Sequence, residues 1–106
     1  MGDQYIHASK PLTATGQLQN LNNENLNRAA VQTLYIVVDD IAAETPASGS
    51  IVMRDGGATG KVLLNLPVTA NSGPVDLELP QRGILFSTDV HVTLTGISSL
   101  VVFYEG

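Results

Sequence analysis

Two segments in the second half of the chain alternate hydrophobic and polar residues with a period of two. VDLEL (75–79) places its aliphatic residues between an aspartate and a glutamate, and VHVTLT (90–95) places them between a histidine and threonines. Successive side chains of a β-strand point to opposite faces of the sheet. Each segment is therefore predicted to be a strand with one buried face and one solvated face.

Five further runs are apolar on both faces or nearly so, which is typical of central strands or of strands that meet a second surface. They are LYIVV (34–38), IVM (51–53), VLLNL (62–66), ILF (84–86) and LVVFY (100–104). Turn-forming Gly, Pro, Asn, Asp and Ser residues separate these runs. Many short strands without a convincing helix predict an all-β fold: an antiparallel β-sandwich or jelly-roll-like small barrel of about seven strands.

Prolines indicate where the strand ladders end or lie at a sheet edge. Pro67, Pro74 and Pro80 have no N–H to donate, so none of them suits the middle of a sheet. Pro74 and Pro80 bracket the segment 75–79, which is short and acidic on one face. These features predict an edge strand that is protected against unwanted pairing.

Residues 1–30 differ in character from the remainder, being polar and rich in Asn and Gln. The spacing of Leu18, Leu21 and Leu26 fits neither a helix nor a strand. Four asparagines between residues 20 and 25 oppose a stable helix, because their side chains compete for backbone groups. We expect an extended N-terminal arm over residues 1–30, with a loosely ordered terminus as the alternative, and a β-sandwich domain over residues 31–106.

Composition narrows the class of protein. A chain of 106 residues is long enough for one domain with its own core. Hydrophobic residues make up 43% and charged residues only 14%, so part of the surface is expected to be covered by a partner. The net charge is -5 and no Lys/Arg cluster is present, which argues against binding to nucleic acid.

The chain has no cysteine, which excludes disulfides and thiolate metal sites. It contains no run of roughly 20 apolar residues that could span a membrane. Its first residues lack the apolar segment of a signal peptide. We expect a protein made in the cytoplasm and not inserted into a membrane.

The segment RDGGATGK (54–61) resembles a phosphate-binding loop, but the spacing is one residue short and a valine follows instead of Ser or Thr. The residues after it favour another strand, so a β-hairpin turn is predicted. Gly56, Gly57 and Gly60 are available for positive φ, and Asp55 is expected to cap the turn by accepting backbone N–H bonds. A calcium site at Asp55 is the lesser alternative, because the spaced ligands of an EF-hand are missing.

Candidates for catalysis are few. His7 and His91 are the only histidines, and His91 is predicted on the polar face of its strand without an identifiable partner. Asp39 and Asp40 are adjacent on a strand and therefore point to opposite faces. We predict no catalytic residues, no cofactor and no metal ion.

The aromatic residues are too few to build a stacking platform for sugars or single-stranded nucleic acid after the core is filled. Phe86 and Phe103 are predicted to lie in the core. One of Tyr35 and Tyr104 is expected to face a neighbouring subunit.

Three segments, in order, resemble a group of small virion proteins of tailed bacteriophages. They are GSIVMRDGGATGKVLLNLPV (49–68), DLELPQRGILFSTDVHVTLTG (76–96) and SLVVFYEG (99–106). The shared pattern is an RDG hairpin, a GI-x-F-S-T strand leading into V-x-V-T-L-T-G, and a closing aromatic strand ending in YE. The resemblance covers roughly residues 34–106 and implies a β-sandwich decoration, cement or adaptor subunit that binds a symmetric shell or tail in many copies.

From these features we expect a non-enzymatic head decoration or cement protein on the capsid surface, forming a homotrimer and binding the major capsid protein. The residues expected to contact partners are Tyr5, Ile6, Leu12, Leu18, Leu21, Leu26, Tyr35 and Tyr104. A tail or head-fibre adaptor, or a receptor- or carbohydrate-binding module, is the alternative. A hydrolase using His91 with a carboxylate is the weakest reading.

Overall fold

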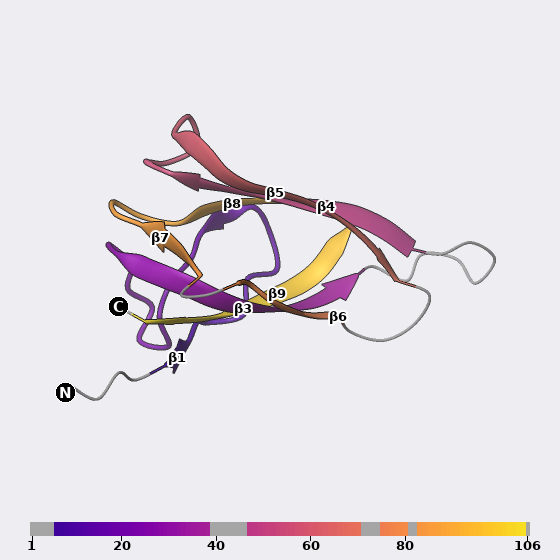
Figure 1. Ribbon diagram of the computed structural model, residues 1–106, viewed down its shortest axis with the longest axis horizontal. Coiled ribbons are helices and arrows are strands. Elements are labelled where there is room, and N and C mark those ends of the chain that lie inside the picture. The colour runs from indigo at the N-terminus through magenta and orange to yellow at the C-terminus, as the bar shows by residue number, and fades with distance from the viewer. Residues whose placement is uncertain (1–5, 39–46, 71–74, 81–82, 106) are drawn as a thin grey trace.

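The computed structural model describes residues 6–38, 47–70, 75–80 and 83–105, which form two stacked antiparallel β-sheets (Figure 1). The described residues contain no helix, and so none that could cross a membrane. The strands are β1 (His7–Ala8), β2 (Gly16–Gln17), β3 (Ala29–Val38), β4 (Ala47–Asp55), β5 (Lys61–Ala70), β6 (Val75–Glu78), β7 (Ile84–Phe86), β8 (His91–Thr95) and β9 (Ile97–Glu105). The all-β prediction is confirmed.

One sheet has the order β1-β9-β3-β6, with β7 also paired to β3, and the other has the order β2-β8-β4-β5. We call them the β9 sheet and the β8 sheet. They are stacked as a sandwich and do not close into a barrel. Each of the seven runs predicted to be strands contributes to one of β3 to β9, and the described residues add two short strands, β1 and β2, to the expected seven.

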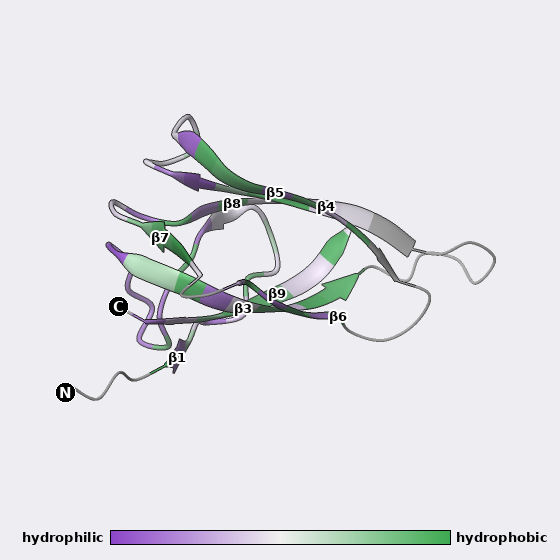
Figure 2. Cartoon of the chain, in the orientation of Figure 1, coloured by the Kyte–Doolittle hydropathy of each residue, from purple (hydrophilic) through white to green (hydrophobic). Residues whose placement is uncertain are grey.

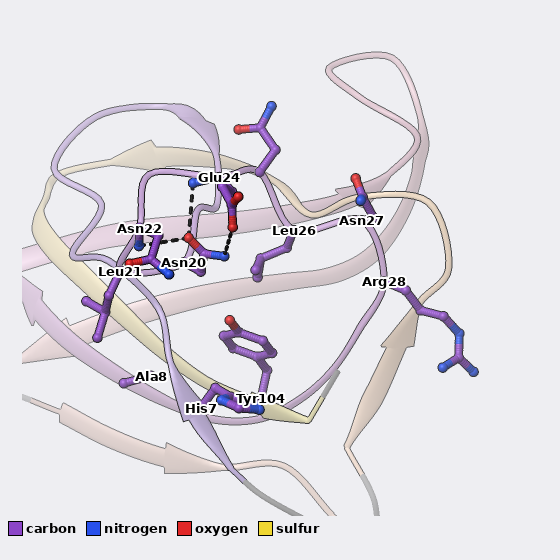
Figure 3. Close-up of a pocket in the computed structure, with 11 residues that line it drawn as sticks. His7, Ala8, Asn20, Leu21, Asn22, Glu24, Leu26, Asn27, Arg28 and Tyr104 are labelled. Carbon is purple, nitrogen blue, oxygen red and sulfur yellow. Dashed lines mark hydrogen bonds between the residues drawn. The ribbon is translucent and has the colours of Figure 1, made fainter.

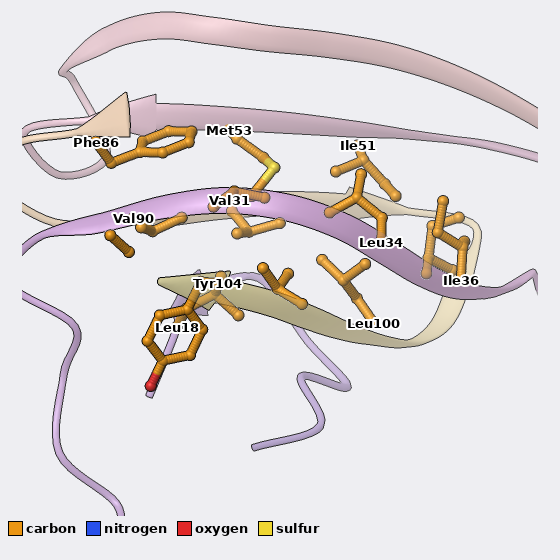
Figure 4. Close-up of a cluster of buried hydrophobic side chains, with 14 of the residues drawn as sticks. Leu18, Val31, Leu34, Ile36, Ile51, Met53, Phe86, Val90, Leu100 and Tyr104 are labelled. Atoms are coloured by element: carbon orange, nitrogen blue, oxygen red, sulfur yellow. The ribbon is translucent and has the colours of Figure 1, made fainter. Parts of the chain in front are cut away.

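The core fills the space between the two sheets (Figure 4). Along β3 and β9 alternate residues are buried, as a period of two requires. Phe86, predicted to be a core residue, is fully buried. Figure 2 colours the strands by hydropathy, and β3 is green toward both of its ends and purple between them.

Phe103 does not lie in the core, so the prediction that placed it there was wrong. Its neighbours Val102 and Tyr104 point inward and are buried, so Phe103 points to the outer face of the β9 sheet. It is only half-buried and does not pack against the core cluster. The run LVVFY is uniformly apolar, and such a run does not indicate which of its two faces is turned inward.

Proline positions agree with the predicted edges. Among the described strands, β6 pairs only with β3, and it lies at the end of its sheet, as expected for the segment 75–79. Pro67 lies within β5, which is the edge strand of the β8 sheet. An edge strand tolerates the missing N–H because its outer side needs no ladder hydrogen bond.

Residues 6–30 are integrated into both sheets. β1 pairs with β9, β2 pairs with β8, and Leu12 forms a bridge to Leu100. The predicted boundary between residues 30 and 31 lies inside β3. Leu18 is fully buried and Leu26 is 6% exposed, so the expectation that these two side chains contact a partner is corrected: they pack in the chain's own core.

Candidate functional site

The predicted hairpin joins β4 to β5 through Gly56, Gly57 and Gly60, and the two strands pair on either side of it. Because β5 follows directly, the loop lacks the helix that a phosphate-binding loop requires. Gly56 and Gly57 have positive φ, as predicted. Gly60 does not, and its need for glycine is steric, since a Cβ there would lie 2.2 Å from the carbonyl oxygen of Asp55.

Asp55 binds the loop that follows β7. Its Oδ2 accepts hydrogen bonds from the N–H and the hydroxyl of Ser87 at 3.0 and 2.9 Å. Its Oδ1 accepts from the N–H groups of Thr88 and Asp89 at 2.8 and 3.2 Å. The expectation that Asp55 caps the hairpin turn is therefore corrected, because the backbone N–H groups that donate to it belong to a loop more than thirty residues away.

Asp89 caps the hairpin turn in return. Its Oδ1 accepts hydrogen bonds from the N–H groups of Gly56 and Gly57 at 2.9 and 3.0 Å. Its Oδ2 accepts a third from Nε2 of Gln17, on β2, at 2.9 Å. We call the reciprocal contacts of Asp55 and Asp89 the aspartate clamp. They join the hairpin between β4 and β5 to the loop that follows β7.

The charge of Asp55 is stabilised by these donors. Backbone hydrogen bonds from Ser87 and Thr88 lower the pKa of Asp55 from its ordinary value of 3.8 to about 2. Four protein donors already bind the two carboxylate oxygens, so the carboxylate is poorly suited to act as a general base. The clamp is therefore a structural device.

A groove of about 760 Å³ lies between the 20–28 segment and the paired ends of β1 and β9 (Figure 3). Its rim is formed by the segment that the sequence marked as rich in asparagine. Asn20 shapes this rim: its Oδ1 accepts the N–H groups of Asn22 and Glu24 at 2.8 and 3.0 Å, and its Nδ2 donates to Glu24 at 2.9 Å. Asn23 has φ of 68°, a conformation that asparagine tolerates better than most residues.

Tyr104 forms the floor of the groove. It is 6% exposed, and in Figure 3 its hydroxyl points toward Leu26 and the asparagine-rich rim. Its ring contacts that of His7, with centroids 5.6 Å apart. Burial raises the pKa of the Tyr104 hydroxyl, so the hydroxyl stays protonated. The expectation that Tyr104 faces a neighbouring subunit is corrected, because its ring belongs to the core.

Of the other residues expected to contact partners, Ile6 is 51%, Leu21 67% and Tyr35 36% exposed, whereas Leu12 is half-buried against the core. The structure does not bring these residues together: Leu21 lines the groove, and Tyr35 lies on the outer face of β3. Tyr5 lies outside the described residues.

The candidate catalytic residues are also dispersed. His91 lies on the same face of β8 as Thr93, as predicted, but its Nδ1 is enclosed and has no hydrogen-bond partner within the described ranges. His7 is exposed at β1. Asp39 and Asp40 fall outside the described residues. Within the part of the chain that the structure describes, no group of three or more His, Cys, Asp or Glu residues is placed to hold a metal ion.

The aspartate clamp and the groove were both missed by sequence reasoning. Each joins segments far apart in the chain, and no periodic signal connects them. The signal that could have pointed to the clamp is an aspartate near the end of each of two strands, Asp55 as the last residue of β4 and Asp89 three residues beyond β7. Comparison of the chain with protein-family models, with curated proteins and with solved structures gives no match.

Proposed function

We propose that this protein is a non-enzymatic phage virion protein of jelly-roll type, a capsid decoration or cement subunit that binds the major capsid protein in many copies. The single observation that carries the proposal is the nesting of the strand pairs. Leaving out β7, the innermost pair is β4 with β5, and around it lie β3 with β6, β2 with β8, and β1 with β9.

Nested antiparallel pairs folded over into two sheets are the arrangement of jelly rolls, which occur in viral capsid and lectin domains. Fold alone does not determine function. The sequence motifs add a second line of support, because Asp55 of the RDG hairpin accepts hydrogen bonds from Ser87 and Thr88 of the GI-x-F-S-T segment. Residues that carry the resemblance to phage virion proteins thus join two segments that are far apart in the chain.

A rigid subunit that stabilises a shell needs surface contacts and many copies more than it needs a reactive site. Copies that touch the shell and one another raise each other's effective concentration, so modest contacts suffice. We further propose a homotrimer, the state implied by the resemblance. A low content of charged residues is compatible with extensive contact surfaces.

The test is to mix the purified protein with expanded heads of the phage that encodes it, prepared without this protein, and to measure sizes by light scattering before imaging the complex. Saturable binding at a fixed number of copies per capsid subunit, arranged with the symmetry of the shell, is the expected result. A protein that leaves such heads undecorated at micromolar concentration contradicts the proposal.

The groove favours a second candidate, a receptor- or carbohydrate-binding module at a tail or head fibre. Asparagine side chains offer both a donor and an acceptor, which suits sugar hydroxyls, and the hydroxyl of Tyr104 has no hydrogen-bond partner in the described part of the chain. Binding on a glycan array that is lost in Asn27→Ala and kept in Thr95→Ala, on the far sheet, would favour this candidate. Decoration of heads without any glycan binding would favour the first.

A further inference from the structure

The outer face of the β9 sheet carries a row of apolar side chains that the core does not use. Tyr35 and Val37 on β3 and Val101 and Phe103 on β9 alternate with buried residues and therefore point away from the other sheet. None of the four packs against the core cluster. We call these four residues the outer stripe.

Strand register makes the outer stripe continuous. Val101 lies opposite Tyr35, and Phe103 lies opposite Thr33 on one side and Ala8 on the other. Side chains at directly opposite positions of antiparallel strands are close neighbours on the same face. The stripe therefore covers the middle of the sheet, where β9 and β3 are flanked by β1 and β6.

Acidic residues flank the stripe. On β6, Asp76 lies opposite Tyr35 and Glu78 lies opposite Thr33, and both acidic side chains are exposed. At the end of β9, Glu105 lies opposite Ala30. The pattern is an apolar centre with a negatively charged rim, which is the usual anatomy of a protein-binding surface.

The outer face of the β8 sheet has a different chemistry. Its cross-strand rows are Thr93–Val52–Asn65, Thr95–Ser50–Pro67 and Gln17–His91–Arg54–Val62. These rows contain no acidic residue, and their apolar members are the aliphatic residues Val52, Val62 and Pro67. The two outer faces of the sandwich are thus unequal, and only the β9 sheet presents an aromatic centre.

We propose that the outer stripe is the surface that docks on the capsid shell, and that its partner is a protein surface with an apolar centre and a rim of Lys and Arg. The inference rests on the proposed function and identifies the outer face of the β9 sheet as the face that binds the shell. Charge decides the partner: two copies packed stripe to stripe would bring two acidic rims of Asp76, Glu78 and Glu105 to one interface, and like charges at an interface are unfavourable. A basic rim on the shell neutralises them.

The absence of cysteine provides the test. Tyr35→Cys places one thiol in the stripe, and Val62→Cys places one at a similarly exposed position of β5, 44% against 36% exposed. Each variant is incorporated into phage particles, and the rate of labelling by a maleimide-polyethylene glycol reagent is compared between free protein and particles. We expect the labelling rate of Tyr35→Cys to fall at least about tenfold in particles, because the centre of an interface excludes solvent, while that of Val62→Cys is maintained.

Equal labelling of Tyr35→Cys in both states, with the protein present in particles, would overturn the docking face and leave the proposed function standing. Absence of wild-type protein from particles would overturn the proposed function and, with it, the shell as partner. These two failures are distinguishable by mass spectrometry of the particles before labelling.

The charge of the rim is tested separately. The double variant Asp76→Asn/Glu78→Gln raises the net charge by two, and Thr93→Lys/Thr95→Lys raises it equally on the other sheet. We expect the first to weaken binding to heads by about 3- to 10-fold at low salt, with the difference from wild type shrinking as salt rises, and the second to have no such effect. Tighter binding of the first variant would contradict a basic partner.

Discussion

Asp55 makes stability depend on pH through its four hydrogen bonds. Its folded-state pKa is about 2, below the ordinary 3.8, so the charged carboxylate stabilises the fold fully above the unfolded-state value. This contribution decreases as pH falls from about 4 and is lost below about 2. We expect Asp55→Asn to melt at a lower temperature than wild type at neutral pH, and the gap to narrow markedly by pH of about 2.5. Thermal unfolding followed by circular dichroism at both pH values measures it; a constant gap would contradict the role of the charge.

Two glycines with positive φ differ in the space around them. Gly57 has φ of 85° and open space where a Cβ would project, whereas at Gly83, with φ of 81°, a Cβ would meet the carbonyl oxygen of Val31 at 1.9 Å. Gly57→Ala should cost only the backbone strain, about 1 kcal/mol of unfolding free energy. Gly83→Ala must also displace β3 and should cost about 3 kcal/mol or more. Urea unfolding of both variants measures the difference, and equal losses would show that the contact with β3 relaxes freely.

The N-terminal segment acts as part of the sandwich, and two of its leucines test this. Leu18 is fully buried between the sheets, whereas Leu21 is 67% exposed. Leu18→Ala should lower the unfolding free energy by about 2–5 kcal/mol through lost burial and a cavity. Leu21→Ala should change it by less than about 0.5 kcal/mol. A free arm would give two near-zero values, so chemical denaturation of this pair separates the alternatives.

At the level of elements, the sequence predicted the strands that have a local hydrophobic pattern. The seven predicted runs correspond to β3 to β9. Short apolar or alternating runs are local signals of strands that are buried against a second sheet. β1 and β2 are two residues long and contain His, Ala, Gly and Gln, so they carry no periodicity. Phe103 was misplaced because its run is apolar on both faces of the strand, and such a run does not tell which face is buried. The aspartate clamp joins residues 34 positions apart, which no local pattern encodes.

For the whole molecule, the nested pairs imply an order of folding. The hairpin of β4 and β5 closes a loop of a few residues, whereas β1 pairs with β9 and so closes a loop of almost the entire chain, His7 lying opposite Tyr104. Closing a long loop costs more entropy than closing a short one. The contacts between distant strands offset this cost only after the inner pairs have formed. The contacts of β1 should therefore form after the folding transition state.

Ser9 provides the probe for that order. It is 1% exposed, its N–H donates to the carbonyl of Val102, and its Oγ accepts the N–H of Val102 at 2.9 Å. Ser9→Ala leaves a buried N–H without a partner and should cost about 1–3 kcal/mol. Because the contact forms late, the variant should unfold faster, by roughly 5- to 100-fold, while its folding rate stays near that of wild type. Stopped-flow folding and unfolding across denaturant concentrations measures both rates, and a slowed folding limb would place the closure of the chain ends before the transition state.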